Sequence, residues 1–184
     1  MRLEAAIRKR HSIRRYSHNS VKWDKIVRIL DAARLAPSAG NLCTLRIILV
    51  SDKGIINEIA SAAKQDFIAY APAVIVACSD PSITLNAYGI RGYRYARQQA
   101  GAAIQNMLLE ITDLGLASCW VGAFNDSTMK KILGIPDDVE IEAILPVAHK
   151  SIIREIPRNK ISLNSILFFD RYGRKQRFYE KMAR

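Results

Sequence analysis

Apolar residues recur along much of the chain at the spacing of helices. Residues 2 to 9 predict a short first helix, and residues 22 to 36 predict a longer one with a single apolar face. Pro37 is expected to end the second helix, because proline lacks the amide hydrogen that would continue it. The apolar positions behind these two predictions are Leu3, Ala6, Ile7, Trp23, Ile26, Val27, Leu30 and Ala33.

Runs of β-branched residues predict strands. Leu45 to Ser51 and Ala73 to Ser79 are of this kind, and apolar spacing at positions 55, 56, 59 and 63 predicts a helix between them. Ile141 to Ala148 predicts a further strand, in which Pro146 indicates an edge position or a bulge.

The most apolar helix is predicted over Arg97 to Leu114, with Gly115 just beyond its end. Such a helix is either the central one of the domain or packs tightly against a partner. Cys119 to Phe124 is interpreted as a strand or an extended segment, in which Gly122 leaves the backbone open to close approach. A short helix is predicted over Ser127 to Leu133, followed by Gly134.

Two segments are less regular. Residues 80 to 96 are rich in tyrosine and arginine and are interpreted as a loop or short helix near a pocket, with an exposed spacer as the alternative. The last 24 residues still carry many apolar side chains, and so apolar a tail needs a surface to lie on, for which another subunit is a candidate. Those side chains are Leu163, Ile166, Leu167, Phe168, Phe169, Tyr172, Phe178 and Tyr179.

Helices and strands mix without a strict βαβ rhythm, which predicts an α+β fold with an open sheet. The 184 residues, 49% of them hydrophobic, suffice for one large globular domain or a domain with an arm. No apolar run approaches the roughly 20 residues that span a bilayer. The three cysteines are far apart and form no CxxC pair, so we expect reduced thiols in a cytoplasmic protein without a structural metal.

The formal net charge of +11 favours anionic partners. Lysine and arginine gather at residues 8 to 15, 91 to 97 and 171 to 184, without zinc-finger spacing or an RNP-type motif. Charge alone therefore predicts the sign of the partner and not its class.

The sharpest candidate for chemistry is Arg10-His11-Ser12-Ile13-Arg14. Guanidinium forks and a hydroxyl suit a phosphate monoester, although a solvated basic turn is the commoner fate of such a run. Pro37 to Asn41 is a loop of small residues that admits another molecule close to the backbone, or an ordinary helix-ending turn.

Four segments together resemble the FMN-dependent nitroreductase family. Residues 10 to 14 are similar to its R-[RH]-S-x-[RK] phosphate turn, and Ala36 to Asn41 to its APSxxN loop. Residues 105 to 124, through QNMLL, GL and WVGAF, match its long helix and the strand after it, and Pro157 to Lys160 is similar to its late basic pair. The likeness covers nearly the whole chain, in the family's order and spacing.

The resemblance implies a three-layer α/β/α sandwich with a mostly antiparallel central sheet. It implies a single domain over residues 1 to 184, with a C-terminal arm of about residues 162 to 184 extending over the partner subunit. It also implies a homodimer with two FMN sites at the subunit interface.

The resemblance further implies roles for particular residues. The phosphate and ribityl end of FMN would be held by Arg10, His11, Ser12, Arg14, Arg158 and Lys160. The other subunit would contribute Pro37, Ser38 and Asn41. The ring would lie along the backbone of Val121, Gly122 and Ala123, with Gln65 as a further contact.

The implied activity is transfer of hydride or electrons from NAD(P)H to a small acceptor such as a nitroaromatic or a quinone, in a ping-pong reaction. Because the flavin carries that chemistry, no catalytic side chain is expected, and none stands out. Two alternatives remain: a flavin-binding relative that dehalogenates substrates or breaks down the flavin, and a nucleic-acid-binding protein whose tail interleaves aromatic and basic residues.

The chain departs from the family pattern in two places. Gln98-Gln99 stands where the family often has an acidic residue, and Leu42-Cys43-Thr44 replaces the aromatic that commonly follows the loop. Neither change removes a phosphate contact, and both leave the substrate open.

Overall fold

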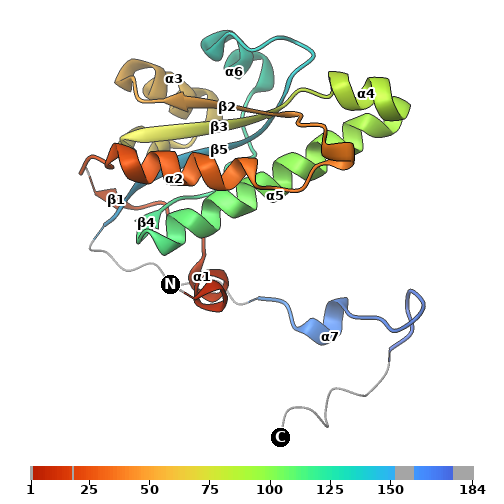
Figure 1. Ribbon diagram of the computed structural model, residues 1–184. Coiled ribbons are helices and arrows are strands. Elements are labelled where there is room, and N and C mark those ends of the chain that lie inside the picture. Colours follow the sequence, from red (N-terminus) through yellow and green to blue (C-terminus); the bar gives the residue numbers. More distant parts are fainter. Residues whose placement is uncertain (1, 18, 152–159, 176–184) are drawn as a thin grey trace, which may run out of the picture.

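The computed structural model describes residues 2–17, 19–151 and 160–175 (Figure 1). Its five strands form one sheet in which every pair is antiparallel. β3 lies between β2 and β5, and the far end of β5 pairs with both β1 and β4. The strands are β1 (Tyr16–Ser17), β2 (Leu45–Val50), β3 (Ala73–Ser79), β4 (Leu116–Ala117) and β5 (Glu140–Lys150).

Helices cover both faces of this sheet (Figure 1). On one face lie α3 and α6, and on the other lie α2 and α5. These two layers around the sheet confirm the predicted α+β fold with an antiparallel central sheet. The α-helices are α1 (Leu3–Lys9), α2 (Trp23–Arg34), α3 (Lys53–Ala63), α4 (Ser82–Tyr88), α5 (Gly92–Asp113), α6 (Asp126–Leu133) and α7 (Leu163–Ile166). Three short 3-10 helices are η1 (Ala39–Asn41), η2 (Asp66–Tyr70) and η3 (Gly89–Arg91).

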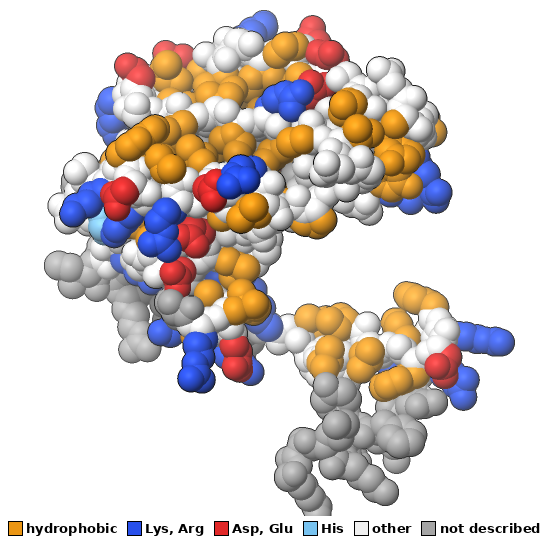
Figure 2. All heavy atoms as spheres, viewed as in Figure 1, with side chains coloured by type: hydrophobic (Ala, Val, Ile, Leu, Met, Phe, Trp, Pro, Cys, Tyr) orange, Lys and Arg blue, Asp and Glu red, His pale blue; other side chains and the backbone are white. Residues whose placement is uncertain are grey.

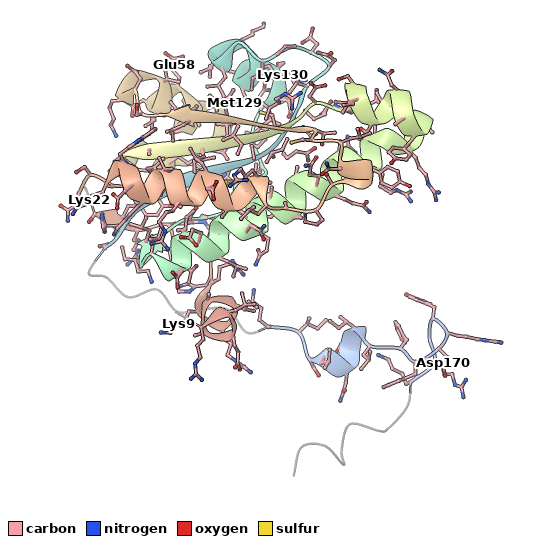
Figure 3. All side chains as sticks on the ribbon, viewed as in Figure 1. Lys9, Lys22, Glu58, Met129, Lys130 and Asp170 are labelled. Carbon is pink, nitrogen blue, oxygen red and sulfur yellow. The ribbon has the colours of Figure 1, made fainter. Side chains whose placement is uncertain are left out.

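Strand β3 is buried at every position, which explains its unbroken apolar sequence. Side chains alternate between the two faces of a strand. Val74 and Val76 therefore join the core under α3 and α6, while Ile75 and Ala77 join the core under α2 and α5. The first core also takes in Met129 of α6 (Figure 3).

The long helix α5 begins at Gly92, five residues before the predicted start at Arg97. The apolar stripe does not reveal this first turn, because Tyr93 and Arg94 are exposed there. α4 packs against the turn at Gly92, where a Cβ atom would collide with the backbone of Thr84. Residues 80–96 thus contain α4, η3 and the start of α5, in agreement with the short-helix interpretation.

Two details of the predicted strands need correction. The strand after α5 is Leu116–Ala117, before the predicted segment 119–124, which is extended and joins the sheet at a single bridge between Val121 and Ile144. Pro146 lies in an interior strand and not at an edge, and the bulge between β3 and β5 lies elsewhere, at Ala77 and Cys78. The proline is tolerated because β4 and the Val121 bridge pair with β5 only on either side of it.

Residues 160–175, which include α7, lie away from the sheet (Figure 1). Their apolar side chains are largely uncovered, and Tyr172 is 95% exposed. The short segment folds on itself, with the Phe168 and Tyr172 rings 4.8 Å apart and the Lys175 ammonium 4.2 Å from the Phe168 ring centre. Figure 2 shows further hydrophobic side chains gathered on the body over β2 and α2. No helix in the described residues is long and apolar enough to cross a membrane.

Candidate functional site

The basic turn, residues 10 to 14, leaves the end of α1 in an extended conformation. Its anchor is Ile13, which is buried and whose amide donates to the Ser118 carbonyl oxygen at 2.9 Å. Arg10, His11 and Ser12 are half-buried around that anchor, and Arg14 is exposed. The His11 Nδ1 donates to the Lys9 carbonyl oxygen at 2.8 Å, which directs the other ring nitrogen away from the helix end.

Behind the turn is a small hollow of about 10 Å³, bordered by Arg10, His11, Thr112, Ser118 and Lys150. The Ser118 hydroxyl is buried, and in the described part of the chain it has no hydrogen-bond partner. A buried hydroxyl without a partner is costly and marks a place where a further polar group fits. The hollow has room for about one water molecule, and the basic side chains of Arg10, His11 and Lys150 border it.

On its other side the turn meets η2. The Arg14 guanidinium carbon lies 5.7 Å from the centre of the Phe67 ring, and the Tyr16 ring meets the same phenyl edge-on at 6.1 Å. Gln65, at the start of η2, donates from Nε2 to the Ala123 carbonyl oxygen at 3.1 Å. Three predicted pieces, the turn, Gln65 and residues 121–123, are therefore brought to one region of a single chain.

Residues 121 to 123 offer backbone to a ligand. Val121 is buried, and its amide and carbonyl pair with those of Ile144 at 3.0 and 2.9 Å. The two residues after it are exposed. A Cβ atom at Gly122 would approach only the Trp120 indole nitrogen, at 3.9 Å, so none of the described residues occupies the space above this glycine.

The loop of small residues lies elsewhere, against the N-terminal half of α5. Its Thr44 is buried, and the Gln99 Oε1 accepts from the Thr44 amide at 2.8 Å and from its hydroxyl at 2.7 Å. Gly40 has a positive φ of 57°, and a Cβ there would collide with the Tyr88 hydroxyl. Asn41 also has a positive φ of 58°.

The two ends of α5 therefore carry different parts of the predicted site. The hollow behind the basic turn is bordered by Ile111, whereas the loop is bound at Gln99, about 18 Å away at 1.5 Å per residue. One chain does not bring Pro37, Ser38 and Asn41 to the turn. Lys160 is exposed on the segment with α7, and Arg158 lies outside the described residues.

The sequence interpretation missed Phe67 and Ser118. Phe67 follows the named Gln65 by two residues, and Ser118 is the polar residue inside the apolar run LASCWV. Neither has a sequence signal of its own, because each owes its place to contacts formed by the fold.

Two of the three cysteines, Cys78 and Cys119, are buried, and Cys43 is exposed just after the loop of small residues. Burial, followed by the charge of Glu142, raises the pKa of Cys78 to about 11. Cys119 is buried with its sulfur 3.6 Å from the Trp120 carbonyl oxygen, as expected of a core thiol. Among the described residues no cluster of histidine, cysteine or acidic side chains could hold a metal ion.

Comparison with known proteins decides the family. The family model described as "Nitroreductase family" matches residues 7–70 and 56–149. The chain belongs to the nitroreductase family. This nitroreductase-family chain is therefore an oxidoreductase, as predicted from its motifs.

Individual relatives agree. A putative NADH dehydrogenase/NAD(P)H nitroreductase of Archaeoglobus fulgidus is 31% identical over 76% of this chain and 80% of its own. A putative nitroreductase of Methanocaldococcus jannaschii is 30% identical over 82% of this chain and 92% of its own.

Solved structures share the fold. A nitroreductase family protein from Clostridium novyi NT has a TM-score of 0.75 and 26% identity, covering 95% of this chain and 97% of its own. An FMN-dependent nitroreductase from Clostridium difficile has a TM-score of 0.77 and 24% identity, and the match covers 91% of this chain and 98% of that one.

The buried Gln99 gives the first prediction. Replacing it by leucine leaves the amide and hydroxyl of Thr44 without their acceptor, which should lower the free energy of unfolding by about 2 kcal/mol. The adjacent, exposed Gln98 is the matched control, and Gln98→Leu should change that free energy by less than about 0.5 kcal/mol. Urea unfolding curves measure both, and equal effects would contradict the role given to Gln99.

Proposed function

We propose that this chain is an FMN-dependent oxidoreductase that takes reducing equivalents from NAD(P)H and delivers them to a small nitroaromatic or quinone. The observation that carries the proposal is the convergence of the basic turn, η2 and the exposed backbone of residues 122–123 in one chain. The names of the relatives, NAD(P)H nitroreductases, support the donor.

The described residues fit FMN, which when bound accepts a hydride from NAD(P)H and passes electrons to the acceptor. Arg10 and Arg14 would bind the phosphate through charge-assisted hydrogen bonds, with Ser12 and His11 completing that end. Gln65 already donates to the Ala123 carbonyl oxygen, so in this proposal its side chain would need little reordering to lie beside the ring. Arg158 and Lys160 join the phosphate end in this proposal.

The second part of the proposal is a homodimer in which each FMN site takes residues from both subunits. The loop of small residues is bound near the N-terminal end of α5, too far from the turn of its own chain. Its residues Pro37, Ser38 and Asn41 would therefore serve the partner's site. Exposed apolar residues on α1 and α2, such as Leu3 and Trp23, provide surface for such an interface. The arm of about residues 162–184 would lie over the partner and bury the side chains that α7 leaves uncovered.

The proposed setting is the cytoplasm, with small molecules as substrates and no nucleic-acid partner. The three cysteines are free thiols, which accords with a reducing compartment. No recognition motif for nucleic acid accompanies the basic clusters.

Two adjacent arginines test the phosphate assignment. Arg14→Ala should raise the dissociation constant of FMN about tenfold or more, because one charge-assisted contact is lost. Arg15→Ala removes the same charge, but its side chain projects to the other side of the extended chain, so its effect should stay below about twofold. Fluorescence titration of the flavin-free protein measures both constants, and equal losses would show only a general effect of charge.

Mixing of two defective variants tests the shared site. Ser38→Trp should block the loop, and the double variant Arg10→Ala/Arg14→Ala should disable the turn, so neither homodimer retains FMN. In a mixed dimer one site pairs an intact turn with an intact loop. Random mixing should thus restore flavin to about a quarter of all sites. If the mixture bound no more flavin than the two parent variants, although both variants were folded and dimeric, a site shared between subunits would be refuted.

The kinetics should be ping-pong, with parallel double-reciprocal lines for NAD(P)H and a quinone. Only one exposed stretch of backbone, at Gly122 and Ala123, is proposed to border the ring, so donor and acceptor must use it in turn. Gly122→Val should fill the open space there and slow both half-reactions, whereas Lys131→Ala, at an exposed position of α6, should slow neither. Intersecting lines would overturn the shared position.

A further inference from the structure

Three arginines near the start of α5 have no partner in the part of the chain that the structure describes. Arg91, Arg94 and Arg97 are all exposed and make no ion pair there. Other arginines are held by carboxylates: Arg28 lies 2.7 Å from Glu110, and Arg46 lies 3.1 Å from Asp80. An unpaired guanidinium keeps its five donors available for a ligand.

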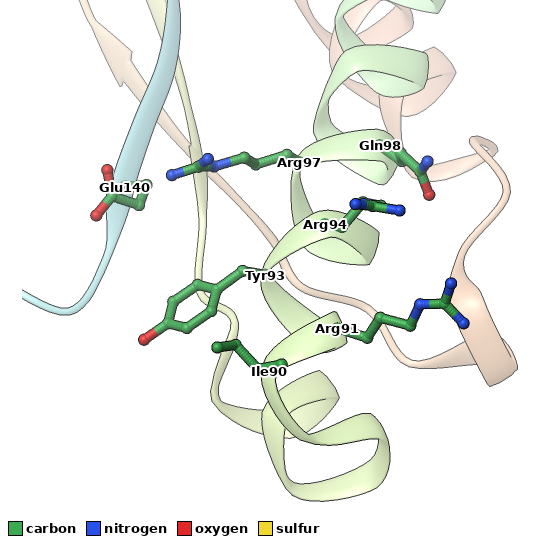
Figure 4. Close-up of a pocket in the computed structure, with 7 residues that line it drawn as sticks. All are labelled: Ile90, Arg91, Tyr93, Arg94, Arg97, Gln98 and Glu140. Atoms are coloured by element: carbon green, nitrogen blue, oxygen red, sulfur yellow. The ribbon is translucent and has the colours of Figure 1, made fainter.

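These arginines border a hollow of about 880 Å³, within the usual size of a small-molecule site. Tyr93, Ile90 and Gln98 line it too, and Ile90 is 87% exposed. Figure 4 shows the Arg97 side chain pointing toward Glu140 of β5. On the opposite side of α5 lie Arg91, Arg94 and Gln98. The two guanidinium groups that point away from the Glu140 carboxylate are therefore together on that side (Figure 4).

That side of α5 adjoins the loop of small residues. Arg91, Tyr95 and Gln99 follow one another at four-residue intervals and so share a helix face. Tyr95 packs edge-on against Tyr88 at 5.1 Å, and Gln99 binds Thr44. Tyr88 in turn is the residue that a Cβ at Gly40 would meet. The free arginines therefore stand beside the loop that the proposed function assigns to the partner's FMN site.

Resting on that proposed function, we propose that Arg91 and Arg94 bind the 2′-phosphate of NADPH at the partner subunit's FMN site. NADPH differs from NADH only by this phosphate, and arginine forks bind a phosphate monoester more specifically than a lone ammonium does. The size of the hollow suits the adenosine end of a dinucleotide better than a one-ring acceptor. The enzyme therefore prefers NADPH to NADH, and the preference weakens as salt screens the exposed guanidinium groups.

The test compares two variants of the FMN-loaded protein that each lose two positive charges. Arg91→Ala/Arg94→Ala should lower kcat/KM for NADPH about tenfold and that for NADH less than twofold, with benzoquinone as an uncharged acceptor. The control Lys22→Ala/Lys131→Ala removes two exposed lysines, one just before α2 and one on α6. It should leave the ratio of kcat/KM for NADPH to that for NADH unchanged.

A binding measurement without turnover gives a second readout. Calorimetry should show adenosine 2′,5′-bisphosphate binding about tenfold more tightly than adenosine 5′-monophosphate, and the arginine variant should lose that difference. Equal losses for both donors, or an unchanged ratio, would overturn the proposal. So would a variant that loses only its preference for 4-nitrobenzoate over nitrobenzene, because the arginines would then bind the acceptor. A wild-type protein that carries no flavin would instead refute the proposed function.

Discussion

The burial of α5 against the sheet is the constraint on which the rest of this structure depends. Its apolar side chains, Ala103 to Ile111, pack beneath β3 and β5, and 22 residues of helix cannot fold back on themselves. The turn attached at one end and the loop attached at the other are therefore held apart. A rigid spacer inside the monomer is thus the physical reason for proposing that a second copy completes the site.

Long-range hydrogen bonds fix both attachments, from a side chain at the loop and between backbone groups at the turn. Gln99 accepts two hydrogen bonds from buried Thr44, and the Ile13 amide is held by the Ser118 carbonyl. Both bonds join segments far apart in the sequence, and breaking either leaves a buried polar group without a partner. The loop and the turn are thereby positioned before any ligand binds, which lowers the ordering cost of binding.

Local sequence signals predicted the elements whose burial is uniform or strictly periodic. β3 could be predicted because all its residues are buried and its sequence is therefore apolar throughout. The end of α6 could be predicted because glycine favours the left-handed conformation that Gly134 adopts there. The signals failed where pairing is decided by distant residues. Leu116 and Ala117 form a strand only because β5 passes beside them, and Pro146 is accommodated by a gap in that same pairing.

The candidate site was predictable to a similar degree. The motif residues were named because their chemistry is local: guanidinium groups and a hydroxyl within five positions, and a glycine that exposes backbone. No local signal could predict which of these residues lie close together in the folded chain. Phe67 lies under Arg14 through the placement of η2, and the arginines at the start of α5 form no ion pair within the described residues, although Arg97 points toward Glu140.

The same charges bear on assembly. If the turn of one subunit meets the loop of the other, Arg10 and Arg14 approach Arg91 and Arg94 across the interface. Like charges brought together oppose association unless an anion lies between them. A phosphorylated cofactor bound by both subunits would remove that repulsion and stabilise the dimer by mass action, since it binds the assembled state alone. The excess of positive charge, which by itself predicts only the sign of a partner, would then make assembly depend on the cofactor.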